Sequence, residues 1–434
     1  MSQSQAQEKS QNSGDLKPLY ARSIVSSLGS GTVTPFLSAY AVKLGASASE
    51  MGLFQSVSNL APSLMQVPWG KLSDKIGRRV PLIVLGSIIA SVLWIPLMLV
   101  ASANQLITVI GIQAILGSMA TPAWTALVGD LVHQSKRGKI TSSINRSAAV
   151  GSLLATLAAG YLMILVQGTV QEMFFIPLLI AALLGVASSL VMLLVREKPH
   201  PNNNSARSIF GLRDVTKNVQ SNSNFLRFCI VSCIFGFFMA MSWPLFTITT
   251  VKVLNASMLE IALISVVQGA VTIALQPLGG RLVDRVGRRQ LMIVYRLGLV
   301  LVPTFYALST SIYHLYMSSV IFGVLVAFGD VAMFAYLLDV TREELRGTLS
   351  AFYNLVTGTV FFVGSLLGGY LGSYFIEIFG LVLGLQLVFA ISAVGRVIGG
   401  LTFTTLKEPY KYPSTLRKEL WQAMLKIPSI LERG

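Results

Sequence analysis

Apolar side chains run in long unbroken stretches along this chain, separated by short polar segments. The clearest stretches are long enough to cross about 30 Å of hydrocarbon as a helix of about 20 residues; they are 81–101, 174–195, 225–251, 291–308 and 379–406. They do not alternate in polarity as the strands of a membrane β-barrel do. The pattern predicts an all-α integral membrane protein with about twelve transmembrane helices, six in each half.

Composition agrees with this pattern. Hydrophobic residues make up 53% of the 434 residues, charged residues only 12%, and the mean hydropathy is +0.68. A soluble domain of this length is much more polar. We therefore expect the lipid bilayer to be the main surrounding of the chain.

The net charge of +15 would favour nucleic-acid binding if the cations shared one soluble face. They lie instead in alternate loops of the predicted spans, and the opposite loops hold only Lys43 and Lys252. This asymmetry places the basic loops and both termini in the cytoplasm, in the cell membrane, and argues against a nucleic-acid partner. The basic segments are the two termini and the loops at 71–79, 136–139, 196–217, 281–289 and 342–346.

The two halves of the chain repeat each other. One loop pattern, formed by Gly70, Asp74, Gly77, Arg78 and Arg79, recurs 210 residues later (284 − 74 = 210) as Gly280, Asp284, Gly287, Arg288 and Arg289. Further pairs follow at nearly the same offset, namely Asp130 with Asp339, Arg137 with Arg346, Gln66 with Gln276 and Asn145 with Asn354. The repeat predicts two pseudo-symmetric six-helix bundles, at 19–195 and 225–406.

Three segments lie outside the predicted bundles. Residues 1–18 are rich in Ser, Gln and Asn and are expected to be disordered in the cytoplasm. Apolar residues recur at helical spacing among cations in 196–224 and in 407–434. We expect a cytoplasmic linker with an amphipathic helix and an amphipathic tail, both on the membrane surface.

On these residues the chain resembles the major facilitator superfamily, because its signature lies between spans two and three and again between spans eight and nine. The resemblance covers essentially the whole chain. It implies two bundles related by an axis along the membrane normal, a substrate site between them, transport by alternating access, and a monomer. By this resemblance Asp74 would form a cytoplasmic gate with Arg78, Asp130 and Arg137, and Asp284 would do so with Arg288, Asp339 and Arg346.

The glycines of the signature also have a physical role. Gly70 and Gly280 are expected to permit close helix approach, and Gly77 and Gly287 to permit the turn into the next helix. A simpler alternative for the arginines of these loops is that they only fix the membrane topology.

Asp330 is the most prominent candidate for chemistry. It lies nine residues from Asp339, about 13 Å along the tenth span, and thus near the middle of the bilayer. An ionisable group at this depth is costly and marks a transport pathway or an ion pair. The sequence leaves two roles open: a proton-coupling carboxylate, or a static partner of Arg296 or Arg396.

The remaining cavity candidates come from the resemblance, in which the first, fourth, seventh and tenth spans line the cavity. It nominates Gln113, Trp124, Trp243, Thr247 and Tyr336, all apolar or uncharged. Arg146 and Arg396 lie well inside their helices and are candidates for binding an anionic substrate, although Arg146 is as well explained by hydrogen bonds between helices.

No nucleotide-binding loop, hydrolytic triad or histidine–cysteine cluster is present in the sequence, so we expect no enzyme, cofactor or metal site. The leading hypothesis is a proton-coupled exporter of small amphiphilic organic solutes. The proton antiporters of the family carry an Arg where this chain has Gln113, and a Gly-Pro pair where it has Ala155 and Thr156. These departures keep open an uptake symporter or facilitator for sugars, organic acids or similar nutrients, and a non-transporting membrane sensor is a third alternative.

Overall fold

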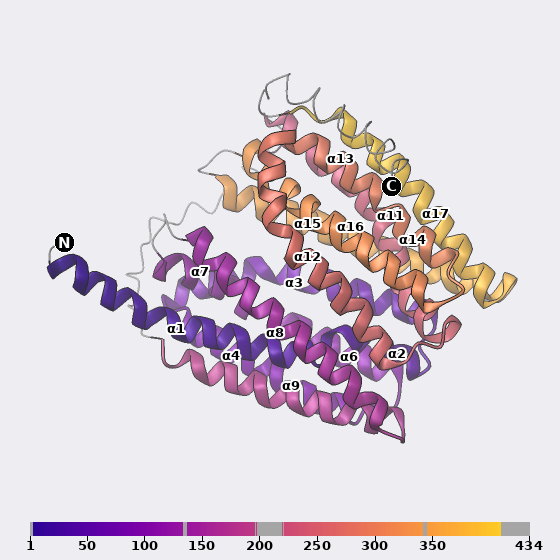
Figure 1. The fold of residues 1–434 in the computed structure, drawn as a ribbon, viewed down its shortest axis with the longest axis horizontal. Coiled ribbons are helices and arrows are strands. Elements are labelled where there is room, and N and C mark those ends of the chain that lie inside the picture. The colour runs from indigo at the N-terminus through magenta and orange to yellow at the C-terminus, as the bar shows by residue number, and fades with distance from the viewer. Residues whose placement is uncertain are drawn as a thin grey trace, which may run out of the picture.

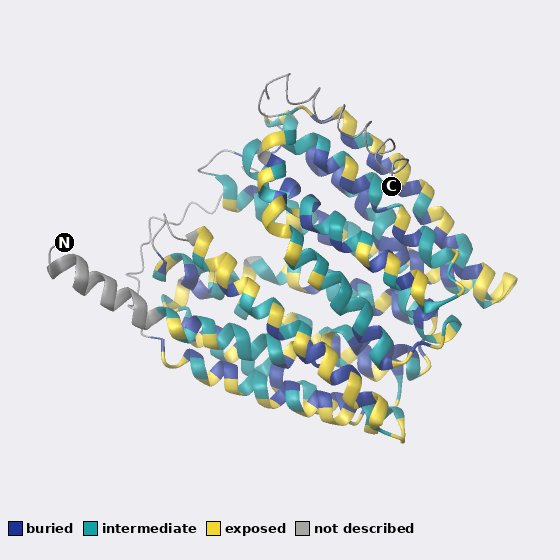
Figure 2. Cartoon of the chain, viewed as in Figure 1, coloured by how far each residue is buried: buried dark blue, intermediate teal, exposed yellow. Residues whose placement is uncertain are grey.

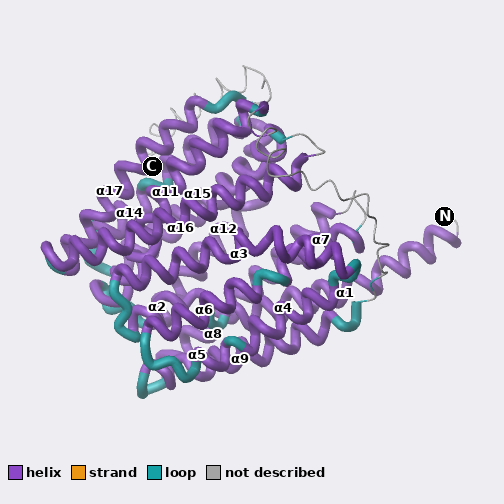
Figure 3. The backbone as a smooth tube through the Cα atoms, turned by 180° about the vertical axis from the view of Figure 1, so that it is seen from behind, coloured by secondary structure: helices purple, strands orange, loops and turns teal. Residues whose placement is uncertain are grey.

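The structure is a computed structural model that describes residues 3–132, 137–195, 197, 219, 221–341 and 345–408, without the side chains of residues 3–15, 67, 74, 137 and 284. All the regular structure in these residues is helical, and short loops join the helices, as Figure 3 shows. The predicted all-α fold is thus confirmed. Most of the linker and of the tail, with their predicted amphipathic helices, lies outside the described residues.

The helices form two groups in chain order (Figure 1). The first group contains α1 (Gln3–Gly31), η1 (Thr34–Phe36), α2 (Leu37–Lys43), α3 (Ala48–Ile76), α4 (Val80–Val92), α5 (Trp94–Leu97), α6 (Ala103–Gly117), α7 (Ala120–Leu131), α8 (Arg137–Leu165) and α9 (Val170–Met192). The second contains α11 (Ser223–Ile248), η4 (Thr249–Val253), α12 (Met258–Val286), α13 (Arg288–Gly298), α14 (Leu301–Ala307), α15 (Ile312–Val340), α16 (Arg346–Phe379), α17 (Leu381–Thr402) and η6 (Phe403–Thr405).

In the described part of the chain, 10 segments are long and apolar enough to cross a membrane. Two further units, which we call the first and second helical rods, are not among them. The first rod is α1 followed by α2, and the second is α3, which carries polar residues such as Gln55, Asn59 and Gln66. With these two, the described helices make twelve rods (10 + 2). The first rod begins at Gln3, in the segment predicted to be disordered, because Gln, Ala, Glu and Lys there favour a helix.

Matching local signals start and end the second rod of each half. Ser47 and Glu50 form a capping box at the start of α3, and Ser257 and Glu260 form the same box at the start of α12. At the other end Gly77 has φ of 67° and Gly287 has φ of 101°. A side chain rarely adopts these angles, so the two glycines make the turns that the sequence predicts.

Two ends of the molecule can be distinguished. We call the end with the loops after α3 and α12 the basic end, and the opposite one the far end. One buried cluster at the far end contains residues of both groups, including Tyr40, Phe174, Leu245 and Ile261. The other two clusters each lie within a single group. One surrounds Phe228 in the second group, and the other lies in the first group. Among the described residues, the buried cluster that both groups share lies at the far end, and Figure 1 shows their ribbons diverging toward the basic end.

Close backbone contacts join the groups at the far end. Gly52 of α3 faces Gly369 of α16 so closely that a Cβ on either would collide with backbone atoms of the other helix. The Ser49 amide donates to Ser373 Oγ at 2.8 Å, and Lys252 Nζ donates to the Ala46 carbonyl at 3.1 Å. Exposed residues lie along the outer faces of the helices (Figure 2), and many of the exposed residues are large and apolar, as expected for surfaces in contact with lipid.

Candidate functional site

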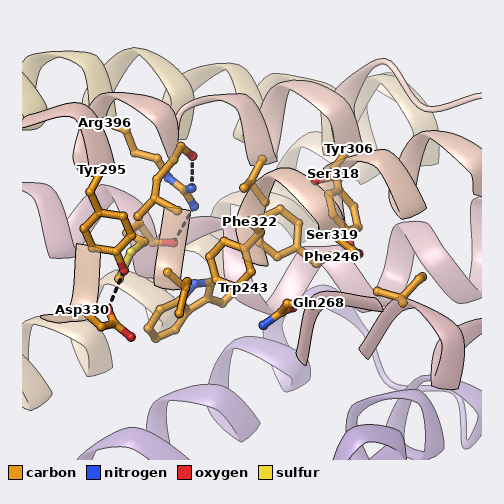
Figure 4. A pocket seen from close by; sticks show the side chains of 15 residues that line it. Trp243, Phe246, Gln268, Tyr295, Tyr306, Ser318, Ser319, Phe322, Asp330 and Arg396 are labelled. Carbon is orange, nitrogen blue, oxygen red and sulfur yellow. Dashed lines mark hydrogen bonds between the residues drawn. The ribbon is translucent and has the colours of Figure 1, made fainter. Parts of the chain in front are cut away.

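A cavity of about 410 Å³ lies inside the second group of helices (Figure 4). Most of its wall is aromatic or aliphatic and comes from α11, α12, α14 and α15; the lining includes Trp243, Phe246, Ile264, Tyr306 and Phe322. Its two charged groups, Asp330 and Arg396, lie with the phenol of Tyr295 toward one end, and a second phenol, Tyr306, lies toward the other. This mixture of a broad apolar wall and a few convergent polar groups is typical of a small-molecule site.

Asp330 lines this cavity from α15 and is exposed to it. Its Oδ1 accepts a hydrogen bond from the Tyr295 hydroxyl at 2.9 Å. The neighbouring Gly329 makes this contact possible, because a Cβ at that position would overlap the Tyr295 ring. The carboxylate is thus held by a neutral phenol that α13 contributes.

Arg396 is 2% exposed and is bound by three acceptors. It donates to the carbonyls of Leu299 at 2.8 Å and Met239 at 3.1 Å, and to Ser242 Oγ at 2.6 Å. These bonds connect α17 with α11 and with Leu299, which lies between α13 and α14. Dipoles of the protein, and not a carboxylate of the described residues, thus solvate this buried cation.

Arg296 is also buried, with 8% of its surface exposed. Its guanidinium lies 4.6 Å from the centre of the Phe235 ring, and its Nη2 lies 3.6 Å from Met333 Sδ. Among the described residues neither Arg296 nor Arg396 forms an ion pair with Asp330. The static ion pair that the sequence leaves open is therefore absent from this conformation.

Tyr295 was missed by the sequence reasoning. The sequence does contain a signal for it. Tyr295 lies next to Arg296 on the ninth span, and Gly329, the neighbour of Asp330, has no Cβ and so leaves room for a ring. Single apolar spans do not reveal which neighbour fills such a gap, so the pair becomes visible only in the structure.

A second cavity, of about 390 Å³, lies between the two groups. Seven of its eleven lining residues carry an amide or a hydroxyl, and none of these described residues is charged; the seven are Asn59, Ser63, Gln66, Ser118, Thr121, Asn354 and Thr357. Phe361 lines this cavity and its ring lies 5.1 Å from that of Trp243, in edge-to-face contact, and Trp243 lines the first cavity. This aromatic pair thus lies between the two cavities.

The nominated cavity residues take different positions. Trp243 lines the first cavity, whereas Tyr336 is fully buried against Phe228 and donates to the Lys407 carbonyl at 2.9 Å. Gln113 Nε2 donates to the Ala90 carbonyl at 2.7 Å, which ties α6 to α4. For Gln113 and Tyr336 the described contacts are those of packing residues.

The other three nominated residues are not brought together. The Trp124 ring lies 4.2 Å from the guanidinium carbon of Arg22, inside the first group. Thr247 is half-buried on α11 and Arg146 is exposed on α8, and neither is among the residues that line the two cavities.

The loop after α3 is held by charged groups from α7 and from the segment that follows α9. Arg79 Nε lies 3.8 Å from Asp130 Oδ2 at the end of α7, so Arg79 reaches this acid. Glu197 accepts hydrogen bonds from the amides of Arg79 at 2.5 Å and Val80 at 2.9 Å. A carboxylate therefore caps the first turn of α4, where the helix dipole favours it.

The loop after α12 has a similar arrangement, shifted by one residue. Arg288 Nε lies 2.9 Å from Asp339 Oδ2, and Glu408 accepts from the amides of Arg288 at 3.1 Å and Arg289 at 2.9 Å. Arg289 also donates to the Thr404 carbonyl. The side chains of Asp74, Asp284 and Arg137 lie outside the described residues, so the expected role of these acids stays a prediction.

The close helix approach expected at the first glycine of each loop is not seen in this conformation. A Cβ at Gly70 or Gly280 would meet no atom within 4 Å, so neither glycine serves a close helix approach in this conformation. The reason is that the two groups diverge at the basic end. The close glycine contacts lie instead at the far end, at Gly52 and Gly369.

Membrane-spanning helices around interior cavities define this protein as a multi-pass membrane transporter. The chain belongs to the Major Facilitator Superfamily, whose model matches residues 20–242 and 228–433. This confirms the resemblance seen in the signature loops.

Individual proteins of known sequence are similar to this chain at low sequence identity. An uncharacterized MFS-type transporter of Methanocaldococcus jannaschii is 23% identical over 359 residues, covering 80% of this chain and 86% of that protein. The multidrug resistance protein MdtG of Klebsiella pneumoniae is 28% identical over 275 residues, covering 60% of this chain and 63% of MdtG. The match therefore spans less than two thirds of the length of MdtG.

Solved structures share the fold at low identity. An inward-facing, unoccupied bacterial homolog of the human lysosomal transporter Spinster superposes with a TM-score of 0.72 at 18% identity, over 93% of this chain and 99% of that chain. A point mutant of the nucleoside transporter NupG gives 0.71 at 15% identity, over 91% of this chain and 100% of that chain. A D-xylose-proton symporter gives 0.67 at 15% identity, over 93% and 99%.

Proposed function

We propose that this protein exports small amphiphilic organic solutes across the cytoplasmic membrane by alternating access, and that Asp330 couples export to proton entry. The observation that carries the proposal is the position of Asp330. It is a carboxylate on a membrane-spanning helix, it is exposed to a cavity, and its described partner is the neutral Tyr295. A carboxylate that no cation holds ionised is free to exchange a proton.

The composition of the cavity supports an amphiphilic substrate. The aromatic wall around Trp243, Phe246 and Phe322 offers apolar area, while Asp330 and Arg396 can orient one polar group at the end of the cavity. Export is supported by the similarity to MdtG, a multidrug resistance protein.

The shape of the molecule supports alternating access. The two groups touch at the far end and diverge at the basic end, which the distribution of Lys and Arg assigns to the cytoplasm, with both termini. This conformation is then the state open to the cytoplasm. Opening the far end around the second cavity would give the opposite state.

Uptake is a second candidate function, favoured by the cavity between the groups. Its uncharged amides and hydroxyls suit a polyhydroxylated solute such as a sugar or nucleoside. Solved transporters of a nucleoside and of D-xylose have the same fold, although at 15% identity.

The test is a flux measurement with purified protein in vesicles that contain a pH-sensitive dye. Amphiphilic cations, amphiphilic anions, sugars and nucleosides are added in turn under an imposed pH gradient. Proton movement started by an amphiphile and abolished by Asp330→Asn supports the proposal. The matched control is Glu377→Gln, the same change at an exposed position near the end of α16, which should keep full activity.

Two results would contradict it. Wild-type proton movement in Asp330→Asn excludes this residue as the proton carrier. Flux of a sugar or nucleoside down its own gradient, without proton movement and with no response to amphiphiles, replaces export by facilitated uptake.

A further inference from the structure

Three charged or phenolic groups meet at one end of the first cavity, and their pairing is unusual. Asp330 and Arg396 line the same cavity, and opposite charges in a medium of low polarity attract strongly. Yet Asp330 binds the Tyr295 hydroxyl, and Arg396 binds two carbonyls and Ser242. The carboxylate and the cation thus each bind neutral groups in the described structure.

The phenol that holds Asp330 is itself fixed. Tyr295 is only 7% exposed, and its ring occupies the space that the absent side chain of Gly329 leaves beside α15. Arg296, the next residue on α13, lies with its guanidinium 5.0 Å from the same ring. A ring packed from two sides has little freedom to move, so its hydroxyl presents one fixed donor to the carboxylate.

We infer that Tyr295 is the positioning residue that keeps Asp330 directed into the cavity and separate from Arg396, and thereby available to protons. Without the hydroxyl, Asp330 loses its described donor and can pair instead with Arg396, a cation that lines the same cavity. An Asp330–Arg396 ion pair would hold the carboxylate ionised and end its exchange with protons. This inference rests on the proposed role of Asp330.

Tyr295→Phe tests the inference, because it removes one oxygen and keeps the ring that fills the space at Gly329. We expect substrate-driven proton movement to fall about tenfold, while flux of the same substrate down its own gradient stays within about twofold of wild type. A residue with only a packing role would lower both rates together.

The decisive comparison is a double-mutant cycle with Arg396→Gln, an amide that can still donate to the carbonyls of Leu299 and Met239. In this background no cation at position 396 competes for Asp330, so adding Tyr295→Phe should cost less than about twofold in proton movement. An equal loss in both backgrounds would overturn the inference, as would full coupling in Tyr295→Phe alone.

Infrared difference spectroscopy across a pH step gives a readout that does not require transport. The charged and titratable groups that line the cavity with Asp330 are Tyr295 on α13, Tyr306 on α14 and Arg396 on α17, while Gln268 on α12 is neutral. Arg296 on α13 and Tyr353 on α16 act on its partner Tyr295. The protonated-carboxyl band that Asp330→Asn removes should vanish in Tyr295→Phe and return in the double variant. Persistence of this band in Tyr295→Phe contradicts the inference even if that variant transports poorly.

The two proposals fail separately. If Asp330→Asn keeps full coupling, the proposed role of Asp330 fails whatever Tyr295 does. If Asp330→Asn abolishes coupling and Tyr295→Phe preserves it, only the role of Tyr295 fails.

Discussion

The contact between Gly369 of α16 and Gly52 of α3 predicts how the far end is held closed. A Cβ on Gly369 would lie 2.6 Å from the Ala48 carbonyl oxygen and 2.6 Å from Gly52 Cα. Both atoms belong to the backbone, so no side chain can move aside. Ordinary contact begins at 3.4 Å, so Gly369→Ala requires the two helices to separate by about 0.8 Å (3.4 − 2.6).

Such overpacking costs about 1–3 kcal/mol. If the strain is present only while the far end is closed, it shifts the equilibrium toward the opposite state by about 5- to 150-fold. We therefore expect Gly369→Ala to depopulate the conformation described here and to slow transport. Gly347→Ala is the matched control: it is the same change on the same helix, with no atom within 4 Å of the new Cβ.

The assay is a distance measurement between spin labels in lipid nanodiscs, after Cys229 and Cys233 have been replaced. One label pair at the far end, on Asn104 and Tyr313, should show a new, longer distance in Gly369→Ala. A second pair at the basic end, on Lys139 and Arg281, should become shorter. Unchanged distances in both pairs would refute the reasoning, and lower thermal stability without a change in distance would assign the contact to folding and not to gating.

Three further predictions concern single residues. Glu197→Ala removes the acceptor of two amides at the start of α4 and should lower the free energy of unfolding by about 0.5–2 kcal/mol, measured by thermal unfolding in detergent against Glu197→Gln. Burial raises the pKa of Glu408 above its ordinary value of 4.5, so the folded state binds the proton more tightly than the unfolded state. The free energy of unfolding should therefore fall as the pH rises from 4.5 through the raised pKa. Glu408→Gln should abolish this pH dependence in melting curves, and an unchanged pH dependence would exclude Glu408 as its source. Trp243→Ala removes one ring of the aromatic pair between the two cavities. It should raise KM about tenfold for compact aromatic substrates and allow bulkier substrates to be transported. An unchanged KM would mean that the substrate does not bind against Trp243.

Much of the architecture follows from the sequence because membrane insertion depends on local composition. Long apolar stretches, alternating basic loops and the paired glycine turns at Gly77 and Gly287 each carry their own physical signal. The first rod is less well predicted, since it continues back to Gln3 through polar residues that favour a helix in isolation.

The site is predicted less completely because its geometry depends on contacts between helices. Asp330 stands out from sequence alone, since a carboxylate in an apolar span is rare. Its partner does not stand out: the sequence offers Arg296 and Arg396, whereas the structure pairs it with Tyr295. Helical phase places a residue on a face but does not state which neighbour fills the space beside a glycine.

The internal repeat separates residues that build the fold from residues that serve the site. Glu197 and Glu408 follow the last helix of each half, 211 residues apart (408 − 197), and each accepts from two consecutive amides at the paired arginines, with the contacts shifted by one residue between the halves. At the offsets of 209 to 210 residues that join the halves, Asp330 corresponds to Ala120 or Thr121 (330 − 210 and 330 − 209), and Tyr295 to Leu85 or Gly86.

The groups at the end of the first cavity thus have no counterpart in the first half, whereas the loops and helix caps do. Duplication preserves what both bundles need in order to fold and to move, and leaves the remaining positions free to diverge. The chemistry proposed for Asp330 and Tyr295 therefore belongs to the second bundle alone. The first bundle would contribute its face of the second cavity and the helix α3, whose contact with Gly369 closes the far end.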